Sequence, residues 1–269
     1  MAPPGMAPNG GTPKLRHPKE STYFALAAVA GVIAWLFLIW IVLLIGWAIA
    51  LPVLLIAWFA EKFFRAQLLG NAVRVSETQF PEIHEMARNF STRLGLTKTP
   101  DIFIVNGNGL VNALAIRRLR NKYILLMSDL VDLLLSTGSL DELGAVVGHE
   151  LGHHALGHTS PLKHLFLFPG LLVPFLGSAY SRACELSADR AGLWLSGSKA
   201  AAIRALGALA CGSRALTPQL NIESFVSQER DAAGFFGFLI NIYSSHPRLT
   251  LRVQELRAAE PAVLGVTTA

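Results

Sequence analysis

The chain has 269 residues and a formal net charge of +5, with 52% hydrophobic and only 15% charged residues. This length allows one good-sized core, or a domain joined to a membrane anchor. The two cysteines, Cys184 and Cys211, are too few for a disulfide scaffold, and we expect both to be buried thiols. No nucleic-acid-binding motif accompanies the positive charge, so we expect no nucleic-acid partner and attribute the charge to attraction to a membrane surface.

The N-terminal part of the chain divides into a polar tail and an apolar block. Residues 1–20 are rich in Pro and Gly and are predicted to form a disordered tail. Tyr23–Ala60 contains no charged residue. One helix of that length would measure about 57 Å, against a hydrocarbon core of about 30 Å. Two spans of about 18 residues each fit better, so residues 21–61 are predicted to form a transmembrane helical hairpin that turns near Trp40 or Gly46.

Basic side chains flank the apolar block at both ends: Lys14, Arg16 and Lys19 before it, and Lys62, Arg65 and Arg74 after it. A hairpin places both groups on one side of the membrane, and the positive-inside rule makes that side cytoplasmic. We therefore expect a multi-pass protein of the inner (plasma) membrane that contacts the lipid bilayer and exposes its remaining chain to the cytoplasm. The alternative is a buried hairpin in a soluble protein.

Residues 62–258 are predicted to form a mainly helical α+β domain, followed by a C-terminal tail at 259–269. Pro81–Leu94 has the apolar spacing of an amphipathic helix. Three short runs of strand-forming residues follow it: Asp101–Asn106, Leu110–Ile116 and Lys122–Ser128. The turn Gly107-Asn108-Gly109 separates the first two runs, and a basic tip, Arg117–Asn121, separates the second and third. This arrangement predicts a small antiparallel sheet.

The next predicted helix begins at Leu140 and ends near Gly157. Ser139 is a suitable N-cap, and Glu142 three residues later completes a capping box. Glycines inside a helix each cost about 1 kcal/mol relative to alanine. Gly148 and Gly152 within this helix therefore predict that another backbone, such as a strand, packs closely against it.

This helix carries the segment His149-Glu150-Leu151-Gly152-His153. Two histidines four residues apart lie on one face of a helix, one turn apart. Their imidazoles can bind one zinc ion, and the glutamate between them can act as a general base toward water. The segment therefore predicts a zinc site with hydrolytic chemistry.

A catalytic zinc ion needs a third protein ligand. The best candidate is Glu185, and Asp189 lies four residues later on the same helical face. Asp189 would accept a hydrogen bond from the free ring N–H of a ligand histidine. The alternative is an ordinary solvated acidic face. Cys184 points about 100° away from Glu185, and His154 and His158 are expected near the end of the helix, where positive charge is favoured.

With these residues the chain resembles the HtpX-like M48 family of membrane-bound zinc metallopeptidases, which is related to the CAAX prenyl-protein protease. The resemblance rests on the apolar N-terminal block, the two helical motifs, and a late His246-Pro247 followed by Arg252. It implies a zincin-like (gluzincin) metallopeptidase domain with Glu150 as the general base. It also implies one Zn²⁺ per chain, held by His149, His153 and Glu185.

Further positions gain roles from this resemblance. Asn112-Ala113-Leu114 is similar to the family's Asn-Ala-Phe edge-strand motif, so Asn112 and Ala113 are expected to bind the substrate backbone by strand addition. His246 either donates a hydrogen bond to the oxyanion or is a helix-entry residue before Pro247. Arg252 either pairs with a site carboxylate such as Asp189 or forms a surface salt bridge.

A topological constraint applies to the apolar segment Leu165–Tyr180. A single membrane crossing there would put His149 and Glu185 on opposite sides of the membrane, and two crossings need roughly 40 residues. The segment is therefore expected to pack on the domain or to dip into the near leaflet. The aromatic run Phe235–Tyr243 is expected to be a buried core helix, with membrane contact as the alternative.

These observations together predict a membrane-anchored zinc endopeptidase that acts on protein or peptide substrates. The resemblance implies that these substrates are misfolded or damaged membrane proteins. One alternative is a maturation protease for one dedicated substrate, such as a lipidated peptide. A second alternative is a non-catalytic membrane adaptor with a structural zinc site. The oligomeric state is not determined by the sequence.

Overall fold

The computed structural model describes residues 15–118, 121–136, 140–232 and 234–259. The expected N-cap Ser139, most of the expected N-terminal tail and residues 260–269 lie outside these ranges. Within them, Leu15 is buried in the main core and Glu20 is 1% exposed. The chain is therefore already packed from Leu15 onward, which differs from the expected disorder through residue 20.

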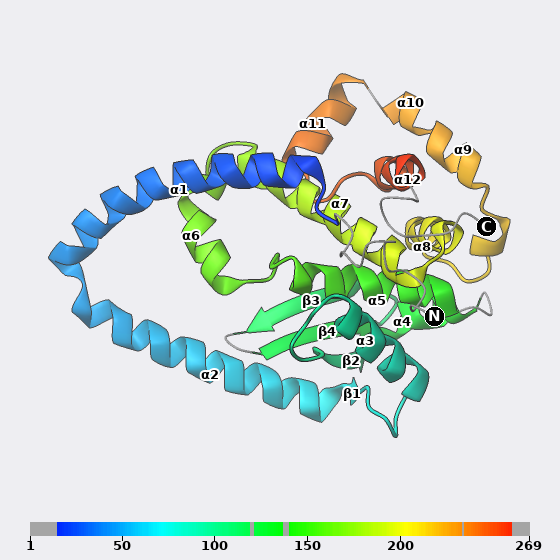
Figure 1. Ribbon diagram of the computed structural model, residues 1–269, viewed down its shortest axis with the longest axis horizontal. Coiled ribbons are helices and arrows are strands. Elements are labelled where there is room, and N and C mark those ends of the chain that lie inside the picture. The colour runs from blue at the N-terminus through cyan, green and yellow to red at the C-terminus, as the bar shows by residue number, and fades with distance from the viewer. Residues whose placement is uncertain (1–14, 119–120, 137–139, 233, 260–269) are drawn as a thin grey trace.

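Two long helices follow the N-terminal segment, α1 (Pro18–Ile45) and α2 (Trp47–Asn71). They meet at Gly46, one of the two turn positions expected, and form a V that opens toward the rest of the molecule (Figure 1). In the part of the chain that the structure describes, one segment is long and apolar enough to cross a membrane, Lys19–Leu43 within α1. Two helices are therefore present, and a hairpin of two membrane spans stays a prediction.

The sheet has four strands, β1 (Val73–Arg74), β2 (Asp101–Val105), β3 (Ala113–Arg118) and β4 (Asn121–Met127), in the order β1-β2-β4-β3. β4 pairs parallel with β2 and antiparallel with β3. The prediction of an antiparallel sheet was therefore wrong, and the sheet is mixed.

The burial of the strands explains this order. β4 is buried from Tyr123 to Met127, and such a continuous apolar run suits a central position. β3 ends in Arg117 and Arg118 and is partly exposed along its length, which suits an edge. The expected turn at Gly107–Gly109 is present, with Leu110 N–H bonded to the Gly107 carbonyl at 2.9 Å, but it leads β3 to the far side of β4.

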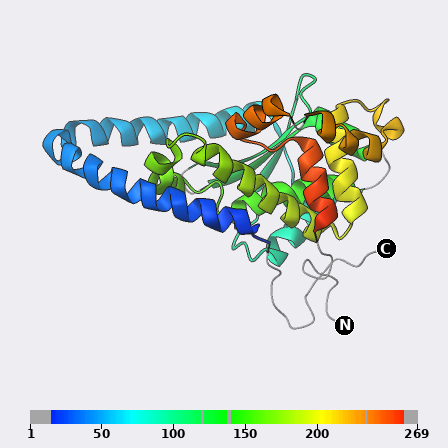
Figure 2. The same ribbon diagram turned by 90° about the horizontal axis from the view of Figure 1, so that it is seen from above.

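Helices cover the sheet and build the core (Figures 1 and 2). The predicted helix at Pro81–Leu94 is α3, and the helix that carries the histidine motif is α5. The helices that follow α2 are α3 (Pro81–Arg93), α4 (Ser128–Leu135), α5 (Leu140–Ala155), α6 (Pro161–Leu171), α7 (Leu176–Ser196), α8 (Lys199–Cys211), α9 (Ile222–Ser227), α10 (Glu229–Ala232), α11 (Phe235–Tyr243) and α12 (Leu249–Ala258), with a short 3-10 turn at Thr217–Gln219.

Helices α5 and α7 pack at unusually short range. A Cβ added to Gly152 would lie 2.7 Å from the Cβ of Ala191, and one added to Gly148 would lie 3.0 Å from the Cα of Gly192. The close neighbour that these glycines predicted is therefore present, but it is a helix and not a strand. Small residues on both helices let the two backbones approach, which brings the side chains beside this contact together.

The two apolar segments near the N-terminal helix are exposed. α6 packs along the middle of α1, where Trp35 Nε1 donates a hydrogen bond to the Leu165 carbonyl at 2.9 Å. α11 carries five exposed apolar or aromatic side chains: Phe235, Phe236, Phe238, Ile240 and Tyr243. The prediction that Phe235–Tyr243 is a buried core helix was therefore wrong, because Gly237 is the only residue of this helix that is buried, although Tyr243 packs edge-on against the ring of Phe175.

Candidate metal centre

Three donor side chains converge between α5 and α7. His149 Nε2 and His153 Nε2 lie 3.1 Å apart. The carboxylate of Glu185 lies 3.6 Å from the first nitrogen and 3.4 Å from the second. Two imidazole nitrogens and a carboxylate that converge in this way can share one cation. The donor set therefore fits one metal ion, and two nitrogens with one oxygen suit zinc.

The helical spacing of the two motifs produces this geometry. His149 and His153 are one turn apart on α5, and Glu185 lies on α7 just before its close approach to α5. Burial alone would raise the pKa of Glu185, but its hydrogen bond with His153 and the charges of His149, His153 and Arg252 outweigh burial and hold the pKa well below its usual range. Glu185 is therefore an anionic donor.

Asp189 orients the first histidine. Its Oδ1 lies 2.9 Å from His149 Nδ1, and Arg252 donates to the same carboxylate from Nε at 2.8 Å and from a terminal nitrogen at 2.6 Å. Burial opposes ionisation of Asp189, but the Arg252 charge and hydrogen bonds, together with His149, lower its pKa. An ionised Asp189 keeps the ring proton of His149 on Nδ1, which leaves Nε2 free to bind a metal.

Arg252 is therefore a buried partner of Asp189 and not a member of a surface salt bridge. Its side chain is only 10% exposed, and the charges of Asp189 and Glu185 raise the pKa of its guanidinium despite the opposing effect of burial. An Arg–carboxylate pair with two parallel hydrogen bonds fixes orientation as well as charge.

The structure corrects the environment expected for His154 and His158. Both are buried, and burial lowers the pKa of each to about 4, so both are neutral near pH 7. Desolvation outweighs the favourable position near a helix end. His154 contacts the Tyr123 carbonyl and Thr159 Oγ1, both at 2.9 Å. His158 lies beyond the end of α5 and faces His153.

A cavity of about 260 Å³ adjoins the three donors. It is lined by all nine residues for which the sequence predicted a role: Asn112, Ala113, His149, Glu150, His153, Glu185, Asp189, His246 and Arg252. They come from β3 and the loop before it, α5, α7, α12 and the loop that precedes α12. The tertiary structure therefore brings the whole predicted set to one place.

His246 lies at the mouth of this cavity. Its Nε2 is 3.6 Å from Glu185 Oε1, and its side chain is 65% exposed. α12 begins at Leu249, so Pro247 does not occupy the first turn, and the helix-entry alternative for His246 does not hold.

Sequence reasoning missed His158 and Glu20, which contact each other beside His153. Their separation in the chain concealed the contact, and Glu20 had been assigned to the tail.

Two histidines that flank a glutamate on α5, with a second carboxylate on α7, are the side chains that define a metallopeptidase by class. Comparison with known proteins gives the family. The model of peptidase family M48 matches residues 77–168 and 161–260. The chain therefore belongs to peptidase family M48, and the family is metal-dependent.

Curated relatives agree with this assignment. The plastoglobule-localized metallopeptidase 48 of Arabidopsis thaliana is 26% identical over 75% of this chain, and the match spans 63% of that protein. Two proteins named protease HtpX homolog are also similar. The one from Paraburkholderia phytofirmans is 27% identical over 74% of this chain and 80% of its own length. The one from Trichormus variabilis is 28% identical over 81% of this chain and 87% of its own length. The chain is thus an HtpX-like member of the family. No solved structure matches.

Proposed function

We propose that this protein is a membrane-anchored zinc metalloendopeptidase that cleaves misfolded or damaged membrane proteins. The observation that carries the proposal is the convergence of His149, His153 and Glu185 on one point, in the same cavity as Glu150 and strand β3. Similarity to proteases named as HtpX homologues supports a proteolytic activity. A structural zinc site would need no general base beside it, so Glu150 speaks against a non-catalytic adaptor.

Each of these residues of the cavity has its own role in the proposed reaction. Zinc would supply Lewis acidity that polarises the peptide carbonyl and lowers the pKa of a water molecule to about 7. Glu150 takes a proton from the attacking water and delivers it to the leaving amine. His246, at the mouth of the cavity, donates a hydrogen bond to the oxyanion in this proposal. Asp189 and Arg252 hold His149 in the ring orientation and tautomer that a metal ligand needs.

Strand β3 is the proposed binding edge for the substrate backbone. The Met127 N–H bonds the Asn112 carbonyl at 3.1 Å. Backbone groups alternate in direction along an antiparallel strand, so Ala113 and Ala115 direct theirs away from β4. The Ala113 N–H is bonded at 2.9 Å by the side chain of Asn112. Ala115 therefore offers the N–H that a substrate strand would use in β-augmentation.

We propose that α1 and α2 cross the membrane as a hairpin and that α6 dips into it beside α1. A Cβ added to Gly31 would lie 2.8 Å from the Phe166 carbonyl oxygen, and Gly31 is about 18 Å along α1 from Lys19, near the middle of a bilayer core. Apart from His164 in the first turns of α6, the outward side chains of this region are apolar. They are Leu162, Leu165, Phe166, Phe168, Leu172 and Val173. In this arrangement the short α6 enters the membrane and α7 leads the chain back out on the same side. His149 and Glu185 therefore both lie on the cytoplasmic side.

The test compares wild type with Glu150→Gln, each purified as the full chain in detergent with equal zinc content. We expect wild type to cleave an unfolded membrane protein and the variant to lose at least about a hundredfold in rate, since general-base catalysis contributes roughly 10²–10⁴-fold. Equal cleavage by the two proteins would reject the peptidase proposal. A lipidated peptide cleaved in strong preference to unrelated unfolded membrane proteins would instead favour a dedicated maturation protease.

A further inference from the structure

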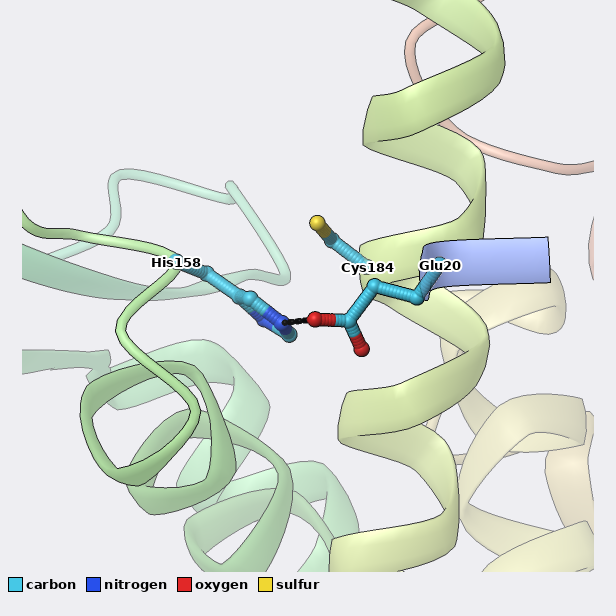
Figure 3. A group of neighbouring side chains, drawn as sticks. All are labelled: Glu20, His158 and Cys184. Carbon is cyan, nitrogen blue, oxygen red and sulfur yellow. Dashed lines mark hydrogen bonds and ion pairs between the residues drawn. The ribbon is translucent and has the colours of Figure 1, made fainter. Parts of the chain in front are cut away.

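A second group of polar side chains lies directly beside the proposed metal centre. Glu20 from the first turn of α1, His158 from the segment after α5 and Cys184 from α7 approach one another, and all three are buried (Figure 3). His158 Nε2 lies 3.2 Å from Glu20 Oε1. The other ring nitrogen, His158 Nδ1, lies 3.0 Å from His153 Nδ1. The imidazole of His158 therefore stands between a carboxylate and a metal ligand.

The ring protons can be assigned from these contacts. If His153 binds metal through Nε2, its single ring proton is on Nδ1. That N–H donates to His158 Nδ1, which must then be the unprotonated nitrogen of its ring. The proton of His158 is consequently on Nε2, where it donates to the Glu20 carboxylate. One tautomer of each ring satisfies both hydrogen bonds.

We propose that Glu20 and His158 form a positioning relay that orients the metal ligand His153, and this proposal rests on the proposed metal site. The relay is the counterpart of Asp189 and Arg252, which act on the other ligand, His149. One histidine is held directly by a carboxylate, and the other is held through an intervening imidazole. Because Glu20 belongs to α1, the proposed membrane helix itself contributes a group to the metal centre.

Glu20 is fixed by further partners, as a positioning group must be. Ser187 donates a hydrogen bond to Glu20 Oε2, and Arg16 forms an ion pair with Oε1. Arg16 also donates to the Leu156 carbonyl at 2.9 Å, which ties the start of α1 to the end of α5. Ser187 lies on α7 between Glu185 and Asp189 and accepts the backbone N–H of His17 at 3.1 Å. The carboxylate of Glu20 is thereby anchored to both helices of the metal centre.

A second metal ion is the competing interpretation, since Glu20, His158 and Cys184 place donor atoms within 4.8 Å of one another. A metal on His158 Nε2 would move the proton of that ring to Nδ1. That N–H would then face the N–H of His153 across 3.0 Å, and two donors repel at this distance. With a metal ion on His153, the geometry therefore favours the relay over a second metal ion.

The first experiment measures zinc affinity by chelator competition on the full chain in detergent. His158→Leu should weaken zinc binding about 10- to 100-fold, the usual effect of losing a hydrogen-bond partner behind a ligand. His154→Leu is the matched control, because His154 is equally buried but contacts Tyr123 and Thr159 and no metal ligand. His158→Gln, whose amide oxygen can accept from His153, should recover part of the affinity.

The melting temperature of the metal-free proteins separates positioning from folding. Both leucine variants should melt lower than wild type, but only the His158 variant should lose zinc affinity. Equal zinc affinity in His158→Leu and wild type, or an equal loss in His154→Leu, would overturn the relay.

The second experiment tests the order of the relay. Glu20→Gln should weaken zinc binding, and the double variant with His158→Leu should be no weaker than His158→Leu alone, because Glu20 acts through His158. Additive losses would overturn that order, and two zinc ions per wild-type chain would overturn the relay in favour of a metal at this group. If the wild-type protein binds no zinc, both the proposed function and the relay are rejected. If wild type and all of these variants bind zinc with the same affinity, the relay alone is rejected.

Discussion

Gly192 of α7 faces the backbone of Ala145 of α5 so closely that no side chain fits between them. A Cβ on Gly192 would lie well inside the 3.0 Å that real Cβ atoms keep from the carbonyl oxygen of Ala145. The contact is between two backbones, so neither side can move away without shifting a helix. Together with Gly148 and Gly152, Gly192 sets the distance between α5 and α7, and with it the distance from His149 to Glu185.

Replacing Gly192 with alanine should therefore weaken both the fold and the metal centre. Overpacking of a core costs about 1–3 kcal/mol, and the displaced α7 would move Glu185 away from the two histidines. Thermal unfolding and zinc affinity should both fall. The control is Gly70→Ala in α2, where no atom lies within 4 Å of the added Cβ, and this change should be neutral or slightly stabilising. An unchanged zinc affinity in Gly192→Ala would contradict the proposed role of this contact.

Arg252→Leu should be strongly destabilising. It leaves the carboxylate of Asp189 buried without its cation, and breaking a buried ion pair on one side costs about 3–5 kcal/mol. Denaturant unfolding measures the loss. Arg214→Ala removes a pair in which both Arg214 and Asp132 have side chains that are 64% exposed, and it should cost no more than about 1 kcal/mol. Similar losses in the two variants would mean that the Asp189–Arg252 pair is not the buried support described here.

The metal-free protein should lose stability as the pH falls from about 6.5 to 4. Burial lowers the pKa of His154 to about 4 from its usual 6.5, so in this window the unfolded chain binds a proton that the folded chain does not. Stability therefore rises with pH across the window, and His154 accounts for about 3 kcal/mol of the change. His154→Leu should flatten the curve of unfolding free energy against pH, and an unchanged slope would refute this account.

Ala115→Pro should impair cleavage with little effect on stability. Proline removes the N–H that faces the open edge of β3, and one backbone hydrogen bond of about 1 kcal/mol corresponds to a loss of several-fold in kcat/KM. Leu114→Pro is the contrasting variant, because its N–H faces β4 and its loss disrupts the sheet. Normal cleavage by a correctly folded Ala115→Pro protein would argue against substrate binding at this edge.

The proposed insertion of α6 can be tested by thiol labelling in membranes. Phe168 on α6 and Leu216 after α8 are equally prominent, with 56% and 58% exposure. A cysteine at position 216 should react with a water-soluble maleimide, whereas a cysteine at position 168 should be protected until detergent is added. Rapid labelling of Phe168→Cys in intact membranes would show that α6 is not inserted.

Much of the secondary structure and part of the candidate site can be predicted from the local periodicity of the sequence. The spacing of four residues in His149–His153 and in Glu185–Asp189 puts each pair on one helical face, and this follows from the helix alone. The apolar stripe of α3 and the break at Gly46 are equally local. Helical spacing also indicated His149, Glu150, His153, Glu185 and Asp189 as site residues before any contact between them was known, whereas the other four candidates were chosen by resemblance to a family.

Contacts between distant segments were decided only by the tertiary structure. The parallel pairing of β2 with β4 depends on which strand is buried on both faces, and short apolar runs do not reveal this. The neutrality of His154 and His158 follows from desolvation by segments far away in the chain. The contact of Glu20 with His158 joins residues 138 positions apart. Helix geometry repeats every few residues and is visible in a sequence, whereas burial and long-range packing exist only once the whole chain has folded.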